Sequence, residues 1–303
     1  MTQAIPLEEA YTVCRAIAKR EAKNFYYAFV ALPKVRRNAI CAIYAFMRMA
    51  DDLADDERFS RQERRVRAEA WLTAWRDVCQ GGETSDPVFV AVRDATQRFA
   101  IPLGLLDELV AGTTMDLKPS AGDVPDTYAT FAELYAYCYL VASVVGLVCI
   151  RIFGYKDKAA EKLAEETGIA FQLTNILRDV AEDAERNRVY LPLEDLAKHG
   201  VSLDALFHRS TGTPPSAAER ALLAGIGRRA ESYYQSAQAL LPLIDRESRP
   251  ALWVLVSIYH ALLKRIQRAD YDVFTRRASV PMVQKLAILA VGLVRMAVAR
   301  LSV

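Results

Sequence analysis

The stretch that decides the fold is GIAFQLTNILRDVAEDAERNRVYLP, residues 168–192. On a helix, positions 168, 172, 175, 179 and 183 follow one another at intervals of three or four and form one polar stripe. The residues beside this stripe, such as Ile169, Leu173 and Ile176, are apolar and suited to a core. A line of amides and carboxylates along a largely buried helix is typical of a cavity wall rather than of an outer face.

A second acidic cluster ends the segment AICAIYAFMRMADDLADD, residues 39–56. Asp51 and Asp55 lie one helical turn apart on one face, and Tyr44 and Arg48 precede them on the same stripe. Like charges at this spacing repel, so the cluster needs a cation or solvent. One such pair is more often a solvated helix end than a site. Two pairs, each with an arginine on or beside its stripe, favour a site.

Oxygen ligands without His or Cys suit Mg²⁺, with Mn²⁺ as the alternative, and exclude a zinc or copper site. Mg²⁺ held by one or two carboxylates normally completes its shell with water and phosphate. With Arg48, Arg178 and Arg188 nearby, the clusters predict a site for a diphosphate and several Mg²⁺ ions, at which the diphosphate departs. The carbocation left behind needs a dry cavity and aromatic faces. The aromatic candidates are Phe25, Tyr26, Tyr27, Phe29, Tyr44, Tyr137, Tyr139, Tyr190 and Tyr259.

Apolar residues recur at helical spacing along almost the whole chain. Only 13 Gly and 12 Pro occur in 303 residues, which leaves few tight turns and disfavours a sandwich or barrel. The predicted helices cover 7–23, 34–57, 62–80, 87–100, 102–116, 128–153, 157–184, 215–240, 248–269 and 281–301. The predicted loops cover 81–86, 118–126, 185–192 and 210–216. The helix at 128–153 is apolar on nearly every side and is expected at the centre. With no linker and no repeat, the sequence predicts a single all-α domain over residues 1–303.

The net charge of +2 argues against nucleic acid as a partner. The five cysteines are scattered and odd in number, which indicates small buried side chains in a reducing, cytoplasmic compartment. The N-terminal residues lack a signal-peptide pattern, and the apolar run Leu286–Val294 is too short to cross a bilayer. We expect the C-terminal segment to pack on the core, while association with a membrane surface stays open. The oligomeric state is not predicted.

At these residues the chain resembles the squalene/phytoene synthase family, the head-to-head prenyl diphosphate synthases, over almost its whole length. Asp51-Asp52-x-x-Asp55, with the preceding Tyr44 and Arg48, is similar to the family's first aspartate-rich motif. Gln172-Leu173-x-Asn175-Ile176-x-Arg178-Asp179-x-x-Glu182-Asp183 is similar to the second, and Arg188-Val189-Tyr190-x-Pro192 to the segment after it. Lys23-Asn24-Phe25-Tyr26-Tyr27 is similar to the family's first-helix element, although a small Ser is commoner where Asn24 stands. Tyr259 and Arg276 fall where the family has a late Tyr and Arg.

The resemblance implies an isoprenoid-synthase-type helical bundle around a central cavity, with the two motifs facing each other at its mouth. It implies that two prenyl diphosphates join through a cyclopropylcarbinyl diphosphate, which rearranges to a linear product. The implied metal ligands are Asp51, Asp55, Asn175, Asp179 and Asp183. The implied substrate-binding residues are Asn24, Phe25, Arg48, Tyr137, Gln172, Asn175, Arg178, Arg188, Tyr259 and Arg276. Tyr44 and Tyr190 join the four aspartates as catalytic candidates, and either a tyrosine or the released diphosphate takes the final proton.

Substrate length follows less directly from the sequence. Phe29 lies four residues after Phe25, on the same face of any helix they share, and its bulk favours two C15 farnesyl diphosphates and a C30 product. The alternative is a phytoene synthase that uses two C20 geranylgeranyl diphosphates. NADPH use stays open, because the family binds it without a G-x-G-x-x-G motif. A terpene cyclase or a head-to-tail elongase would also use paired Asp-rich helices. A non-catalytic helical assembly factor is disfavoured by the four retained aspartates.

Overall fold

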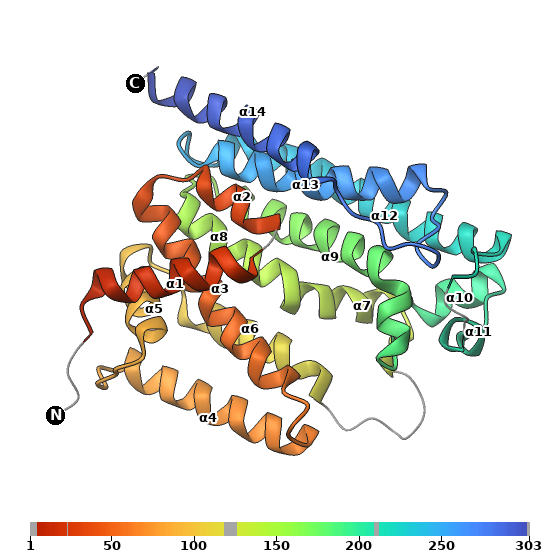
Figure 1. The fold of residues 1–303 in the computed structure, drawn as a ribbon, viewed down its shortest axis with the longest axis horizontal. Coiled ribbons are helices and arrows are strands. Elements are labelled where there is room, and N and C mark those ends of the chain that lie inside the picture. The colour runs from red at the N-terminus through yellow and green to blue at the C-terminus, as the bar shows by residue number, and fades with distance from the viewer. Residues whose placement is uncertain (1–4, 23, 118–125, 209–211, 302–303) are drawn as a thin grey trace.

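The computed structural model describes residues 5–22, 24–117, 126–208 and 212–301, and nearly all of their regular structure is helical (Figure 1). The N-terminal part contains α1 (Leu7–Glu21), α2 (Asn24–Val30), α3 (Lys34–Asp55), α4 (Arg61–Cys79), α5 (Pro87–Arg98), α6 (Leu103–Thr114) and the short 3₁₀ turn η1 (Met115–Leu117). The middle part contains β1 (Asp126–Thr127), α7 (Phe131–Cys138), the π-helical turn η2 (Tyr139–Ser143), α8 (Val144–Phe153), α9 (Ala159–Glu185) and β2 (Arg188–Val189). The C-terminal part contains α10 (Leu193–His199), α11 (Leu203–Phe207), α12 (Ala217–Leu240), η3 (Leu241–Leu243), α13 (Arg249–Arg268) and α14 (Met282–Leu301).

Helix starts follow the local sequence. Asp86 accepts a hydrogen bond from the backbone N–H of Val88 at 2.7 Å, and Pro87 occupies the first position of α5. Ser60 and Ser216 are the N-cap residues of α4 and α12, and each forms a capping box. The serine hydroxyl accepts a hydrogen bond from the backbone N–H of the glutamate three residues later, and the carboxylate of that glutamate accepts one from the backbone N–H of the serine. These starts agree with the predicted helices to within one or two residues.

Helix α9 lies in the middle of the fold and packs against α12, α8 and η2 (Figure 1). Its buried face includes Ile169, Leu173 and Leu177, which the sequence assigned to the core. Helix α3 packs against α1, α5 and α4, and α13 packs against α2, α14 and α9. Both α3 and α9 run towards the right of Figure 1, so the two acidic clusters lie at the same end of the molecule.

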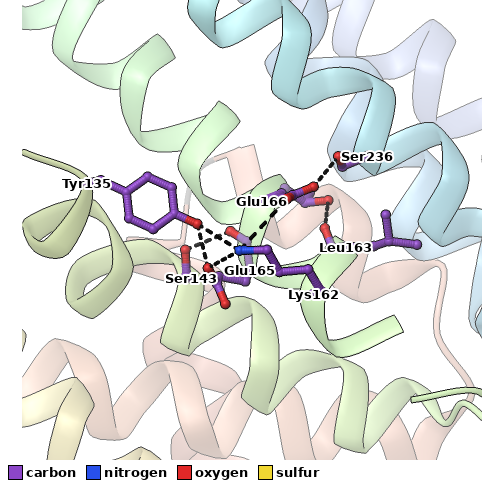
Figure 2. A network of polar contacts seen from close by, with 8 residues as sticks. Tyr135, Ser143, Lys162, Leu163, Glu165, Glu166 and Ser236 are labelled. Atoms are coloured by element: carbon purple, nitrogen blue, oxygen red, sulfur yellow. Dashed lines mark hydrogen bonds and ion pairs between the residues drawn. The ribbon is translucent and has the colours of Figure 1, made fainter. Parts of the chain in front are cut away.

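The close approach of η2 to α9 depends on Gly168. A Cβ atom at this position would lie 2.5 Å from Cα and 2.7 Å from N of Ser143. A polar network also ties this part of α9 to α7 and α12 (Figure 2). Glu165 accepts from Tyr135 and, at 2.7 Å, from Lys162, and the Ser236 hydroxyl donates to Glu166 at 2.5 Å. These contacts fix the start of α9, from which the polar stripe extends.

Some expected elements differ in the structure. The helix expected at 128–153 is three pieces, α7, η2 and α8, because one π turn interrupts the α-helical hydrogen bonds. The predicted helix at 7–23 ends at Glu21, and the separate helix α2 follows it. The expected loop at 185–192 contains β2, which pairs in parallel with β1. Residues 118–125, 210 and 211, which belong to the predicted loops at 118–126 and 210–216, lie outside the described residues.

The segment Phe131–Phe153 is the one helical stretch in the described part of the chain that is long and apolar enough to cross a membrane. Length and composition alone give this result, and 44% of its most apolar window is buried inside the protein. Its parts pack against α6, α9 and α3, which places it among the central helices, as its sequence predicts.

All five cysteines are free thiols, and each is buried or half-buried. Cys14 and Cys41 lie on the neighbouring helices α1 and α3, while Cys138 and Cys149 belong to the central α7 and α8. Burial raises the pKa of every one of these thiols.

Candidate active site

The first acidic cluster ends α3, whose other face is buried in the core. Asp51 is half-buried, whereas Asp52 and Asp55 are exposed. Arg48 forms its ion pair with Asp52, one turn away. Burial raises the pKa of Asp51 to about 7, and the neighbouring charge of Asp55 adds to this effect. The charge of Arg48 compensates only in part, so this end of α3 has a deficit of positive charge.

The second cluster occupies the C-terminal half of α9, where the predicted stripe forms. Asn175 Nδ2 donates to the side-chain Oε1 of Gln172 at 3.4 Å, and the Oδ1 of Asn175 is buried without a hydrogen-bond partner. Burial raises the pKa of Asp183 to about 7, with a further contribution from Asp179. An orphaned amide oxygen on the same helix as a carboxyl group that resists ionisation fits a divalent cation, since amide oxygens and carboxylates both suit Mg²⁺.

The pKa of Asp179 is shifted in the opposite direction from that of Asp183. Arg178 Nε donates to Oδ1 of Asp179 at 2.7 Å, and Arg277 donates to the same oxygen at 2.8 and 3.0 Å. Burial opposes ionisation of Asp179, but these two guanidinium groups outweigh it and lower its pKa. Arg277 also lies 3.1 Å from Glu182. A cation that binds Asp179 must therefore compete with two arginines.

Tyr259 of α13 lies near residues of both clusters. Its ring stacks on Phe171 of α9 at a centroid distance of 4.5 Å and lies 5.5 Å from the ring of Phe25 on α2. Burial raises its pKa to about 12, while Arg178 and a hydrogen bond from Asn175 lower it, and the charges of Asp179 and Tyr44 also act on it. Tyr44 belongs to the first cluster's stripe. The two motifs therefore border one common aromatic region.

Three further tyrosines form a separate stack beside β2. The rings of Tyr137 and Tyr190 are nearly parallel with centroids 4.9 Å apart, and Tyr128 lies 6.2 Å from Tyr190. Tyr190 follows Arg188 and Val189, whose backbone pairs with Asp126 and Thr127. This two-residue pairing sets the course of the chain after the second motif, and it brings Tyr137 and Tyr190 together as buried neighbours.

A hollow of about 570 Å³ lies beside the first cluster. Its lining residues are Arg48, Met49, Asp52, Leu53, Asp55, Asp56, Arg58 and Trp71. No three His, Cys, Asp or Glu side chains in the described part of the chain are grouped so as to hold a metal ion by themselves. Any Mg²⁺ would therefore need ligands from outside one cluster, such as phosphate oxygens or water.

The structure brings some of the predicted substrate-binding residues together and leaves others apart. Phe25 and Tyr259 contact each other, and Gln172, Asn175 and Arg178 share α9. Asn24 begins α2, but its side chain lies outside what the structure describes, as does Lys23 altogether. Arg276 and Arg277 are both exposed, and Arg277 contacts the second cluster. Sequence reasoning missed Arg277, and the only available signal was the Arg-Arg doublet itself.

A set of helices that presents two acidic motifs to one aromatic region defines the class of isoprenoid synthases. The sequence model of the family "Squalene/phytoene synthase" matches residues 18–284. The chain therefore belongs to the squalene/phytoene synthase family, and it is a prenyltransferase with the all-α isoprenoid synthase fold.

Curated relatives match almost end to end. A 15-cis-phytoene synthase of Synechococcus elongatus is 35% identical, with 95% of this chain and 94% of that protein aligned. A phytoene synthase of Mycobacterium tuberculosis is 34% identical over 95% of this chain and 91% of its own length. Among solved structures, a ligand complex of a dehydrosqualene synthase has a TM-score of 0.84 at 28% identity, covering 96% of this chain and 98% of its own. A squalene synthase from Alicyclobacillus acidocaldarius has a TM-score of 0.78 at 26% identity, covering 88% and 97%.

Proposed function

We propose that this chain condenses two C20 prenyl diphosphates head to head, through a cyclopropylcarbinyl diphosphate, and releases phytoene. The observation that carries this proposal is the 34–35% identity, over more than nine-tenths of their length, to proteins named phytoene synthase. The sequence alone favoured two C15 units and kept phytoene as the alternative. The relatives support the alternative better than that first preference.

The aspartates and the amide of the two motifs have roles in this proposal. Asp51 and Asp55 on α3, with Asn175, Asp179 and Asp183 on α9, would hold the divalent cations, for which Mg²⁺ is proposed. The cations supply positive charge that offsets the negative charge of the departing diphosphate. Arg178, Arg188 and Arg277 bind the diphosphate oxygens, and on substrate binding Arg178 and Arg277 exchange their bonds to Asp179 for bonds to phosphate. Arg48 and Gln172 are proposed to orient or hold the same diphosphate.

Aromatic faces stabilise the carbocation in this scheme. The buried rings of Phe171 and Tyr259 and the half-buried ring of Phe25 lie next to the second motif, so they offer π faces to a cation in a region that is largely closed to water. Tyr44 and Tyr259 both have a pKa of about 12, chiefly because of burial. A phenol that keeps its proton at neutral pH is a poor base. We therefore assign the final proton to the released diphosphate, and this product requires no NADPH.

A second candidate, dehydrosqualene synthesis from two C15 units, has its own supporting observation. The dehydrosqualene synthase structure has the TM-score of 0.84, and Phe29 is buried with its ring edge-on to Tyr44 at 6.0 Å. If this ring shortens the space for a prenyl tail, Phe29→Ala raises the ratio of C20 to C15 turnover. An unchanged ratio would mean that Phe29 serves packing alone.

Product analysis tests the proposal. The purified protein is incubated with Mg²⁺ and either geranylgeranyl or farnesyl diphosphate, with and without NADPH, and the hydrocarbons are identified by mass spectrometry. We expect a C40 triene-centred hydrocarbon from the C20 substrate, independent of NADPH. A C30 product from farnesyl diphosphate with no C40 product would replace the proposal by the second candidate. No product from either would revive the assembly factor.

A further inference from the structure

Helix α14 carries most of the apolar side chains that the protein exposes. Ten large hydrophobic side chains are exposed in the described part of the chain, and six of them belong to α14. These six are Met282, Val283, Leu286, Val291, Val294 and Val298, with exposed fractions from 45% to 79%. The sequence favoured packing of this segment on the core. The structure confirms this packing, on α13 and α2, and leaves the other face of the helix exposed.

The exposed residues form a continuous stripe. Val283, Leu286, Ala290, Val294 and Val298 follow one another at intervals of three or four, and all of them are exposed. Over its 20 residues the helix is about 30 Å long. Contiguous apolar surface of this extent is uncommon on a protein that meets only water, and it marks an interaction site.

The opposite face of α14 is occupied by the protein itself. At Gly292 the helix packs so closely on α13 that a Cβ would lie 2.3 Å from a methyl group of Val254. Met282 accepts a hydrogen bond from the Tyr27 hydroxyl of α2 at 2.8 Å through its sulfur. The helix therefore lies flat along the molecule, and only its outer stripe is available to a partner.

The charges around the stripe select the partner. The basic side chains of α14 that the structure describes are Lys285 and Arg295, and the sequence from Val273 to Val303 contains no Asp or Glu. Arg295 lies over the ring of Trp253 of α13, 4.1 Å from its centroid, at the border of α14. An apolar stripe bordered by basic side chains and by the ring of a tryptophan, Trp253, is typical of a helix in the headgroup region of an anionic bilayer. A two-fold contact between copies would instead bring these cations close to their own equivalents.

We propose that the outer stripe of α14 inserts into the surface of an anionic lipid bilayer, with the helix parallel to the membrane plane. Trp253 and Tyr259 belong to the same helix, α13, and Tyr259 contacts Phe25 of α2. The bilayer would therefore lie one helix away from the aromatic region of the candidate site. Delivery of an apolar product to that bilayer rests on the proposed function, whereas lipid binding does not.

Vesicle sedimentation without substrate tests the proposal. We expect the protein to sediment with vesicles of phosphatidylglycerol and phosphatidylcholine in equal parts, less with pure phosphatidylcholine, and less at high salt. The double variant Val283→Glu, Val294→Glu should lose about tenfold or more of its affinity. The matched control is Val35→Glu, Val66→Glu, at sites that are 50% and 51% exposed on α3 and α4. Thermal midpoints and turnover of detergent-dispersed substrate should match in both doubles.

A second measurement needs no change to α14. Brominated lipids should quench the fluorescence of Trp253, and Trp253→Phe should remove that quenching. The other tryptophans, Trp71 and Trp75, belong to α4, on the opposite side of the molecule in Figure 1. Three results would each overturn the proposal. In the first, the wild-type protein binds neither kind of vesicle. In the second, the α14 double variant binds vesicles as well as the wild type does. In the third, the wild type is a dimer and the α14 double variant is a monomer. The last result would identify a second copy as the partner.

Discussion

Asp51 and Asp179 show how differently two carboxylates of one predicted set are held. Asp51 is half-buried near other carboxylates, and its pKa is raised to about 7. Asp179 is bonded to Arg178 and Arg277, and its pKa is lowered. In the proposed scheme, a divalent cation would relieve the charge repulsion at Asp51, whereas at Asp179 it would have to displace guanidinium groups. The two arginines would then keep Asp179 ionised until diphosphate offers them other oxygens.

Replacing these aspartates tests their role as ligands. Asp51→Asn and Asp179→Asn should each lower turnover by about 100-fold or more, because a cation that offsets leaving-group charge loses a ligand. Steady-state kinetics with saturating Mg²⁺ measures this loss. Asp204→Asn, at a side chain that is 84% exposed on α11, is the matched control and should change nothing. A variant that loses activity only because its thermal midpoint collapses would point to a structural role.

Substitution of the two adjacent arginines in the loop before α14 tests which of them binds the diphosphate. The resemblance points to Arg276, whereas the structure brings Arg277 to Asp179 and Glu182. We expect Arg277→Ala to raise the KM for the prenyl diphosphate about tenfold or more, because a charge-assisted bond to phosphate is lost. Arg276→Ala is the matched control, measured in the same kinetic assay. A larger effect at Arg276 would return the role to the residue indicated by the sequence.

At the level of elements, the junction between η2 and α9 depends on a missing side chain. Gly168→Ala places a Cβ 2.5 Å from backbone atoms of Ser143, which cannot rotate away. We expect the free energy of unfolding to fall by about 1–3 kcal/mol, as for other overpacked positions. Gly104→Ala in α6 is the control, because nothing lies within 4 Å of its added Cβ and alanine favours a helix. Denaturant unfolding compares the two, and equal midpoints would show that η2 can shift.

Sequence periodicity predicted the long helices and much less of what interrupts them. The stripes of α3 and α9 are visible because apolar and polar residues alternate at helical spacing over many turns. The π turn at Tyr139–Ser143 contains no Gly or Pro that could mark it in the sequence, and the glycine that allows its close approach to α9 is Gly168, on another helix. Helices α2, α10 and α11 have five to seven residues, too few for a periodic signal. Arg277 lies in a loop, where no period distinguishes it from Arg276.

At the scale of the whole molecule, the raised carboxyl pKa values connect stability to pH and to metal. Asp51 and Asp183 have a pKa of about 7 in the folded protein, against an ordinary value of 3.8. Their protonated forms favour the fold, so this stability is present below about pH 4 and is lost as the pH rises to about 7. Asp179, with its lowered pKa, stays ionised throughout that interval and does not contribute to the loss.

Thermal unfolding in EDTA and in Mg²⁺ should reveal this connection. Without metal, we expect the midpoint to fall between about pH 5 and about pH 8 as the two carboxyls ionise. Mg²⁺ should raise it more at the higher pH, because only ionised ligands bind the cation. The double variant Asp51→Asn, Asp183→Asn should flatten both dependences and raise the metal-free midpoint at the higher pH by about 2–4 °C. A metal response that persists in this variant would place the cations elsewhere.

The five cysteine side chains give the protein a practical property for labelling. Burial keeps every native sulfur in its protonated, unreactive form near neutral pH. Maleimide dyes react with thiolates, so the folded wild type should stay almost uncoloured without the removal of any native cysteine. A single engineered cysteine at Val298 would then take up the dye selectively, and its emission would report in real time when that end of the molecule leaves water.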